Sequence, residues 1–570
     1  YLGGNVTTTG AQTYNDAISL TGNVVLNASA ITTASTMAAG SYNLTITTDA
    51  ISLGSNLTGT GALVIQPKTV SATVAVGNSA AGTLALSDTA LTYINDHFSS
   101  ITIGSASGTS ALTVDYSAAS FTFTNPLVLR SGTGNITAID TLRTGSNSLT
   151  VNTGGTVTLA GVISGALSVT GSAITLNNDI TTAGSQSYTG PVSLTANLAF
   201  DSTTSSSNGA VSFSSTVNSA TSTARNLSVV AGSGNVTFTG AVGNLNPLGA
   251  IAIDSTGTTT FGSTVNAASL ATNTGGTTSL GGNVTTTGAQ TYNDGVNLVG
   301  PVSISASAAT FVSSITGNAN SSFMVSTTGS SSFGGTITTT GAVDLKGSSR
   351  TTQLFSDVTI NTTNSDVTAG TINGGTGTAD GTYAFNVNNG TGNIVAGNAG
   401  LVIKLKSLAF TGTGNTNIGT VDATNGYDLG ADRGLTLNAD TSYYNPNVDV
   451  ILGAITLGDN VTLTLGNGGP GLISVKSISG TATSTAGVLS GKSNVVIDSV
   501  GTVRVLGNVG TDIGTITISN SGGTTFSGTV DAATLAITTT TASNAVTFSG
   551  NLTLTTGLTV GAGSAAYNVA

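Results

Sequence analysis

A block of fifteen residues occurs twice in this chain. Residues 2–16 read LGGNVTTTGAQTYND, and residues 280–294 read the same letters. A second unit, TTTFGSTVNAASL at 258–270, returns as GTTFSGTVDAATL at 523–535. Similar local contexts recur at intervals of roughly 18 to 25 residues, the length of one solenoid coil. A chain built by copying such a unit is restricted to folds in which each unit buries its apolar face against its neighbours.

Short alternating runs predict the strands of these coils. Examples are LTI at 44–46, ISL at 51–53 and LVI at 63–65. Each run places apolar side chains on one face and Ser, Thr or another small residue on the other. Gly-Gly, Gly-Asn and Thr-Gly pairs separate the runs, and such residues tolerate tight corners. We therefore predict an all-β fold, a parallel β-helix (β-solenoid) with irregular coils of roughly 18–25 residues.

Two other all-β folds fit the sequence less well. Arrays of sandwich domains have longer strands and usually a buried Trp, and this chain has no Trp. An outer-membrane barrel needs strands of about ten residues with girdles of aromatic side chains. Aromatic residues make up only 5% of the chain, which favours the solenoid.

Composition supports strands and turns over helices or disorder. Charged residues make up 6% of the chain, against about 25% in typical proteins. All 23 acidic residues are Asp, and Lys and Arg together number 12. Hydrophobic residues make up 38% of the chain, which is too many for a disordered segment. The net charge of −11 disfavours nucleic acid as a partner, because no basic patch is available to meet phosphates.

The sequence also bears on redox chemistry and membrane insertion. No Cys occurs, so disulfides and thiolate chemistry are excluded. No run of about 18 apolar residues occurs, so we expect no membrane span. The chain begins with Tyr1, without an initiator Met or a targeting segment. We therefore expect it to be a piece of a longer protein.

We predict one continuous solenoid domain over residues 1–570, with two departures from the regular pattern. Residues 87–98 (SDTALTYINDHF) predict an inserted helix of two to three turns, with Ser87 or Asp88 as the N-cap residue. Leu91, Ile94 and Phe98 follow at helical spacing. Residues 422–459 gather Asp residues around a Tyr-Tyr-Asn-Pro segment, which indicates a longer loop or less regular coils.

Candidate catalytic groups are few. His97 is the only histidine, and we interpret it as a polar residue near the end of the short helix, where the helix dipole favours it. Some β-helices process polysaccharides with paired carboxylates, but no Asp-Asp pair occurs in this sequence. We therefore expect no catalytic residues, no cofactor-binding residues and no enzymatic activity.

A calcium site is a weaker expectation. GGTGTAD at 374–380 approaches the Gly-Gly-x-Gly-x-Asp repeat that binds calcium, but Ala379 stands where an Asp is needed. We expect no metal as the default, with Asp366, Asp380, Asp428 and Asp432 as weak calcium candidates. Their alternative role is that of solvated turn residues, because Asp favours corners.

The repeated block itself predicts packing and not a binding motif. GSQSY at 184–188 keeps its Gly-x-Gln-x-Tyr core. We predict that Gly10 and Gly288 form corners, and that Gln12 and Gln290 bond to the backbone. We also predict that three tyrosines each pack or stack at a fixed place in their coils: Tyr14, Tyr188 and Tyr292.

The run GGNVTTTGAQTYND at 3–16 resembles the repeats of large bacterial exoproteins of the filamentous-haemagglutinin-like class. So do residues 510–535, and residues 62–114, which include LSDTALTYINDHFSSITIG, are similar to a recurring module of the same exoproteins. The resemblance covers about half of the chain. It implies a right-handed β-helix shaft exported to the surface of a Gram-negative cell, with a role in adhesion, aggregation or biofilm.

These observations together predict a structural protein of the cell surface, either an adhesin shaft or a subunit of an extracellular fibre. The bare end of a solenoid is an unpaired strand edge, so we expect self-association end to end or laterally. A host surface, a neighbouring cell or glycans are further expected partners. The alternatives are a β-helical polysaccharide-processing enzyme and a calcium-dependent surface-layer protein.

Overall fold

The computed structural model shows a β-solenoid of about 25 turns, as the sequence pattern predicts. It forms two compact units, residues 1–287 and 288–570. The prediction that the coils form one continuous domain stays a prediction. The structure describes residues 1–95, 97–116, 121–205, 208–345, 351–375, 380–444, 447–481, 491–510, 512–541, 544–563 and 567–569.

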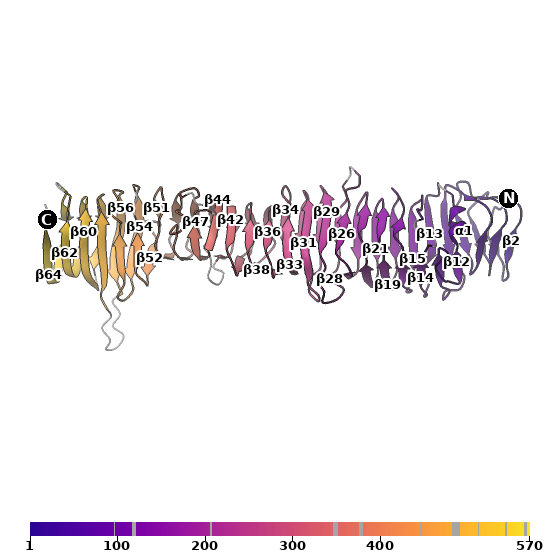
Figure 1. Cartoon of the computed structure of the whole chain (residues 1–570), viewed down its shortest axis with the longest axis horizontal. Coiled ribbons are helices and arrows are strands. Elements are labelled where there is room, and N and C mark those ends of the chain that lie inside the picture. The colour runs from indigo at the N-terminus through magenta and orange to yellow at the C-terminus, as the bar shows by residue number, and fades with distance from the viewer. Residues whose placement is uncertain are drawn as a thin grey trace. The chain divides into compact units, whose positions relative to one another are not determined.

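Parallel pairing from coil to coil builds the first unit (Figure 1). Strand β4 (Val24–Asn27) pairs with β7 (Leu44–Thr47), which pairs with β10 (Ala62–Gln66). Because side chains alternate along a strand, Ile46 and Ile65 point inward and are fully buried, one above the other. The coil length follows from this register, since equivalent residues lie about 20 positions apart.

The second unit repeats this construction. Strand β47 (Phe385–Asn388) pairs in parallel with β49 (Leu408–Thr411), and β54 (Val450–Leu457) pairs in parallel with β56 (Ile473–Gly480). The inward residues of these strands are Val, Ile, Leu and Phe, and they form the buried core of the unit. Figure 1 shows the strands of successive coils side by side within each unit.

Aromatic side chains stack through the core along the coil axis. In the first unit Tyr188, Phe213, Phe238 and Phe261 lie on four successive coils, and their ring centroids are 4.9, 5.0 and 5.1 Å apart. The rings are almost parallel, with interplanar angles of 9°, 6° and 3°. The spacing equals that of hydrogen-bonded strands, so the ladder fixes the stacking distance. Offset-stacked rings of this kind add stability beyond their buried area.

The same arrangement occurs in the second unit. Tyr292 stacks on Phe311 with centroids 4.9 Å apart, and Phe311 stacks on Phe333 at 5.3 Å. The prediction that Tyr188 and Tyr292 stack is confirmed. Tyr14 differs, because the next coil places Thr33 opposite it and not an aromatic residue.

Asn side chains bridge neighbouring coils at the corners. The Oδ1 atom of Asn5 accepts the backbone N–H of Val25, and Oδ1 of Asn23 accepts that of Asn43, each at 2.9 Å. Asn43 in turn accepts the N–H of Ala62 at 2.8 Å. Each bond spans 19 or 20 residues, which is one coil. These short polar side chains satisfy backbone groups where the strand ladder ends, which explains why Asn is so frequent.

The predicted helix exists but is shorter than two turns. It comprises α1 (Asp88–Thr92), and the Ser87 side chain accepts the N–H of Ala90 as the predicted N-cap. The helix ends because Ile94 joins a parallel bridge with Leu57 of the preceding coil. Tertiary strand pairing therefore overrides the helical spacing that the sequence shows beyond Thr92. Residue 96 of the predicted helix lies outside the described residues.

The Asp-rich segment 422–459 contributes strands to the second unit. These are β51 (Tyr427–Asp428), β52 (Gly434–Leu437), β53 (Thr441–Tyr443) and β54, and all of their pairings are parallel. Residues 445–446 of its Tyr-Tyr-Asn-Pro segment lie outside the described residues. The described part of the segment therefore contains strands that pair with neighbouring coils, with other residues between them.

Candidate functional site

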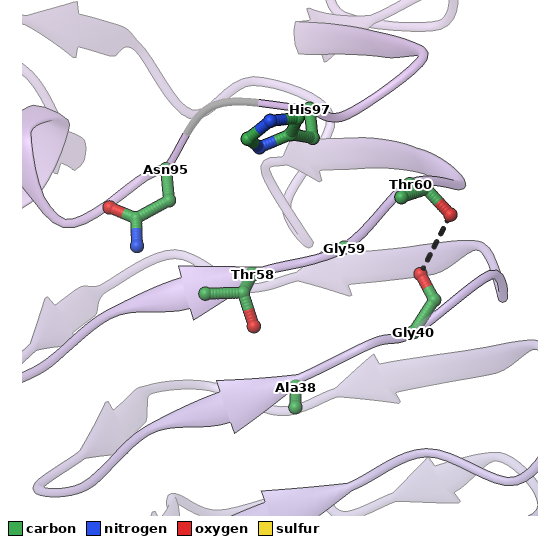
Figure 2. Close-up of a pocket in the computed structure, with 7 residues that line it drawn as sticks. All are labelled: Ala38, Gly40, Thr58, Gly59, Thr60, Asn95 and His97. Carbon is green, nitrogen blue, oxygen red and sulfur yellow. Dashed lines mark hydrogen bonds between the residues drawn. The ribbon is translucent and has the colours of Figure 1, made fainter.

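A shallow groove of about 490 Å³ lies in the first unit, where the insertion that carries α1 overhangs the neighbouring coils (Figure 2). Its floor comes from two coils, through β6 (Met37–Ala38), β9 (Leu57–Thr58) and the residues that follow each strand. Asn95 and His97 of the insertion form its wall. The lining residues are Ala38, Gly40, Thr58, Gly59, Thr60, Asn95 and His97.

Backbone hydrogen bonds hold the insertion against the coil at two points. On one side Leu57 N–H donates to the carbonyl of Tyr93 at 2.8 Å, and Asn95 N–H donates to the carbonyl of Leu57 at 3.0 Å. On the other side Ser99 N–H donates to the carbonyl of Gly61 at 3.0 Å. Asn95 itself and Ser99, two residues beyond His97, are therefore tied to the coil by backbone bonds.

The Phe98 side chain packs between the insertion and the coil. Its side chain is buried, and a Cβ added at Gly59 would lie 2.7 Å from Phe98 Cε1 and 2.9 Å from the Cβ of Ala39. Residue 59 must therefore be Gly for the ring to pack this closely on the coil. A Gly at this position thus serves both the floor of the groove and the anchoring of its wall.

His97 occupies a strained backbone conformation. Its φ is 93°, a region that non-glycine residues enter rarely and at a cost of about 1–3 kcal/mol. The residue is exposed and lies five positions beyond the last residue of α1. The prediction that it sits at the helix end, stabilised by the dipole, is therefore wrong, because the helix stops early. A strained exposed residue over a groove is a reason to suspect a functional position.

The groove offers neutral hydrogen-bonding groups above a floor of small residues. The Thr60 hydroxyl donates to the carbonyl of Gly40 at 3.3 Å (Figure 2). Thr58 and Asn95 add a hydroxyl and an amide to the lining. His97 is the only titratable group among the described lining residues. The site can therefore donate and accept hydrogen bonds, but it presents no fixed charge of either sign there.

The four calcium candidates do not come together. Asp366 Oδ1 accepts the N–H of Asn393 at 2.8 Å, and Asp380 Oδ1 accepts that of Lys404 at 2.9 Å, each one coil away. These two carboxylates thus act as the corner Asn residues do. Within the described ranges, no group of three or more acidic or His side chains is arranged to hold a metal ion.

The other two candidates have local partners as well. Asp428 Oδ1 accepts the N–H of Gly430, two residues further on, at 2.7 Å. Asp432 forms an exposed ion pair with Lys476, in which Nζ lies 3.2 Å from Oδ1. Both arrangements are typical of turn residues, which is the alternative role that the sequence suggested.

In the repeated Gln-x-Tyr element, the Tyr hydroxyl bonds to the Gln side chain, which in turn bonds to the backbone; we call this arrangement the Gln-Tyr bracket. Gln186 Nε2 donates to the carbonyl of Asp201 at 2.9 Å and to the hydroxyl of Thr182 at 3.2 Å, while Tyr188 OH donates to Gln186 Oε1 at 3.0 Å. Tyr292 donates to Gln290 in the same way at 2.8 Å, and Gln290 Nε2 donates to the carbonyl of Ser305. The prediction that Gln12 and Gln290 bond to the backbone is confirmed, since Gln12 Nε2 also donates to the carbonyls of Val6 and Asn27, each at 3.1 Å.

Burial makes the tyrosines of this bracket less acidic than an exposed tyrosine. Tyr188 and Tyr292 are completely buried, and desolvation of the phenolate raises the pKa of both side chains well above the ordinary value of 10.0. Tyr14, in the first copy, is only half-buried, and burial raises its pKa as well. It keeps the bond to Gln12 Oε1 at 2.8 Å, so the bracket forms even at the margin of the unit.

Arg433 is a buried polar residue that sequence reasoning missed. Its side chain is 1% exposed and donates to the Thr416 hydroxyl at 2.8 Å, to Asn389 Oδ1 at 3.0 Å and to the carbonyl of Gly392 at 2.9 Å. Neither of the two ion pairs among the described residues includes it. Burial lowers the pKa of its guanidinium.

The role of Arg433 is to join coils. Its acceptors belong to two earlier coils, because Thr416 lies 17 residues back and Asn389 lies 44 residues back. The Ser-Thr-Gly-rich context gives no signal for a buried Arg, and only an Asp-Arg-Gly turn marks the position in the sequence.

No protein-family model, curated protein or solved structure matches this chain. The resemblance to filamentous-haemagglutinin-like exoproteins therefore rests on the sequence motifs alone.

Proposed function

We propose that the chain is a structural protein, a stiff segment of an adhesin shaft or fibre at the outer surface of a Gram-negative cell. The β-solenoid supports this role, because its backbone hydrogen bonds run along the coil axis. The observation that carries the proposal is the parallel, coil-by-coil register within each unit, exemplified by Leu44 over Leu63 and by Val450 over Ile473. Tension along the axis is then shared by several parallel ladders of bonds.

The interior of the coils supports stiffness. Three kinds of contact recur along the axis: stacked rings, bonds from the Gln of each bracket to a backbone carbonyl of the next coil, and corner Asn bridges. Each joins one coil to the next, so bending or shearing a unit disturbs all three at once. Close packing of this kind resists deformation, because interiors have few voids to yield into.

The extracellular setting rests on the sequence resemblance. A cell-surface shaft accords with a chain that carries little charge, no Cys and many hydroxyl and amide side chains. Within the described residues, no helix has the length and apolar character of a membrane span. We propose adhesion, aggregation or biofilm formation as its biological role, with self-association end to end or laterally and contact with a host or neighbouring cell surface. We propose no catalytic activity.

Force spectroscopy tests the mechanical proposal. The full chain is tethered by its two ends and extended. Peeling of single coils releases about 20 residues at a time, or roughly 70 Å of contour length for each step. A ladder of such steps supports a shaft. One large event that releases a whole unit at low force would contradict it.

Electron microscopy and sedimentation test the assembly proposal. Negative-stain images of the purified chain are expected to show elongated particles, and sedimentation velocity is expected to show association that increases with concentration. Compact particles would contradict the shaft. Monomers at every concentration would contradict self-association without affecting the mechanical role.

A further inference from the structure

We propose that residues 68–71 form an acid-released strap that ties together the first coils of the chain. This strap follows β10 on the fourth coil. Bonds from it reach the first, third and fifth coils, which contain β1 (Val6–Thr7), β7 and β13 (Ser100–Ser105). Coils of a solenoid otherwise contact only their neighbours. The strap adds a regulatory element to the chain and does not depend on the mechanical role.

Asp49 anchors one side of the strap. It follows β7, one coil before the strap, and its Oδ1 accepts the backbone N–H groups of Lys68 at 3.0 Å and of Thr69 at 2.8 Å. Its Oδ2 accepts the Thr69 hydroxyl at 2.6 Å. Hydrogen bonds to an ionised carboxylate are roughly twice as strong as bonds between neutral groups. The hold on the strap therefore depends on the charge of Asp49.

Lys68 extends the strap to the first coil. Its Nζ donates to the carbonyl of Thr8 at 3.0 Å, and Thr8 lies 60 residues earlier, directly after β1. Equivalent residues on these coils lie 20 positions apart, as in the pairing of Val6 with Leu26, so the bond passes over two intervening coils. Because other contacts along a solenoid pass from neighbour to neighbour, the strap couples the opening of the first coil directly to that of the fourth.

The other side of the strap contacts the following coil. The Val70 carbonyl accepts the backbone N–H of Thr109 at 2.9 Å. The Ser71 carbonyl accepts the hydroxyl of Ser110 at 2.6 Å. Both partners follow β13, so these bonds tie the strap to the fifth coil.

Polar bonds hold the strap, and apolar burial does not. The side chains of Thr69 and Ser71 are exposed, and Val70 is 49% exposed although it is apolar. The strap thus contributes almost nothing to the core of the unit. Since three of its bonds end on Asp49, loss of that anchor is expected to free the strap while the strands around it stay paired.

Acid removes the charge on which this anchor depends. Partial burial opposes ionisation of Asp49, but hydrogen bonds from Thr69 and Lys68 and the charge of Lys68 outweigh it, so the pKa of Asp49 lies below its ordinary value of 3.8. Among the described residues, Lys68 is the one charged group that acts on this carboxylate. A carboxyl whose pKa is lowered by folding contributes stability that is complete above its unfolded pKa of about 3.9 and is lost as the pH falls through the folded value. The strap should therefore hold at neutral pH and release in acid.

Hydrogen exchange with mass spectrometry tests the strap, and the repeated block supplies an internal control. Residues 2–16 include Thr8, and residues 280–294 have the same sequence, so the intrinsic exchange rates of the two blocks agree at every pH. The full chain is labelled at neutral pH and at several acidic values. Peptides that extend beyond each block into its own flanking residues distinguish the two copies. The ratio of protection in the first block to protection in the second then isolates local opening of the first coil.

We expect this ratio to be constant near neutral pH and to fall about two- to tenfold in acid, the net worth of bonds between partly exposed groups. Asp49→Asn keeps the shape of the side chain without its charge, so it should show the low ratio already at neutral pH and little further change in acid. Asp366→Asn is the matched control, because Asp366 also accepts an N–H one coil away but lies in the second unit. This variant should keep both the ratio and its pH dependence.

Lys68→Met tests the reach to the first coil separately. It keeps most of the aliphatic stem and leaves Asp49 free to accept its backbone bonds, but it removes the ammonium that donates to Thr8. The ratio should fall at neutral pH in this variant as well. An unchanged ratio would overturn the tie between the fourth coil and the first.

Three other results would overturn the proposal. One is a ratio in the unaltered chain that does not change in acid, another is an acid response that survives in Asp49→Asn, and the third is an equal loss of protection in both blocks, which would indicate general unfolding. None of these results bears on the force ladder, so failure of the strap leaves the mechanical role standing.

Discussion

Replacing the buried Tyr188 by Phe tests how much the hydroxyl of the Gln-Tyr bracket contributes to stability. The substitution keeps the ring, and with it the stack on Phe213, but removes the hydroxyl that donates to Gln186 Oε1 at 3.0 Å. Both Tyr188 and Gln186 are 0% exposed, so no water reaches the acceptor that loses its partner. The chain supplies its own controls, because the bracket occurs again at Tyr292, where it is equally buried, and at Tyr14, where it is not.

The expected magnitude follows from burial. Leaving a buried acceptor unsatisfied costs about 1–3 kcal/mol, whereas an acceptor within reach of water loses only the modest net value of the bond. We therefore expect Tyr188→Phe and Tyr292→Phe each to lower the local free energy of unfolding by about 2 kcal/mol. Tyr14→Phe is expected to cost less than about 1 kcal/mol, because the half-buried site admits solvent.

Native-state hydrogen exchange with mass spectrometry measures these local values. Solenoid coils open locally, so a single global unfolding curve would blur the effect. Protection is followed in peptides covering each bracket and its neighbouring coils. Equal losses at all three sites would refute the reasoning, since the motif is shared and only burial differs. A loss below about 0.5 kcal/mol at both buried sites would show that the hydroxyl is not needed to satisfy the Gln.

Three further predictions follow from the same interior. Burial raises the folded pKa of Tyr188 and Tyr292, so their contribution to folding stability is intact below the ordinary tyrosine pKa of about 10 and is lost as pH rises above it. An alkaline titration followed by circular dichroism and tyrosinate absorbance should show these two tyrosines ionising only as structure is lost. Ionisation of all tyrosines before structure is lost would contradict this. Gly155→Ala should destabilise its coil, since the new Cβ would lie 2.7 Å from the carbonyl oxygens of Gly134 and Thr133, whereas Gly10→Ala has nothing within 4 Å and should be neutral or slightly stabilising in the same exchange measurement. Arg433→Lys should lower local stability by about 2–4 kcal/mol, because a single ammonium cannot reach acceptors on two earlier coils; unchanged protection of β52 and β47 would show that the guanidinium bonds are dispensable.

Much of the fold could be predicted from short-range pattern. Inward and outward alternation in runs such as Leu44-Thr45-Ile46 is a property of the strand backbone, and the spacing of copies is the coil length, so both are visible in the sequence. The Gly-x-Gln-x-Tyr element recurs with its structure because its bonds lie within one coil or reach only the next. The roles of Gln290 and Tyr292 were therefore within reach of sequence reasoning.

The length of the helix and the environment of each repeat depended on the neighbouring coils. Identical letters surround Tyr14 and Tyr292, yet only the second meets an aromatic residue, because the facing residue is Thr33 in one case and Phe311 in the other. Helical spacing extended from Ser87 to Phe98, but the strand bridge to Leu57 ended the helix early. Local sequence could not show either contact, since each partner lies on another coil.

The sequence by itself determined that this chain winds into parallel coils with a small apolar interior, because that outcome depends on alternation and period. Only the tertiary structure decided which polar side chains lie close together. It set Asn95 and His97 above Thr58, across tens of residues of intervening chain, and it buried Arg433 among acceptors from two earlier coils. The physical reason is that a solenoid brings together residues separated by whole coils, and the contents of one coil do not specify what the next will place against it.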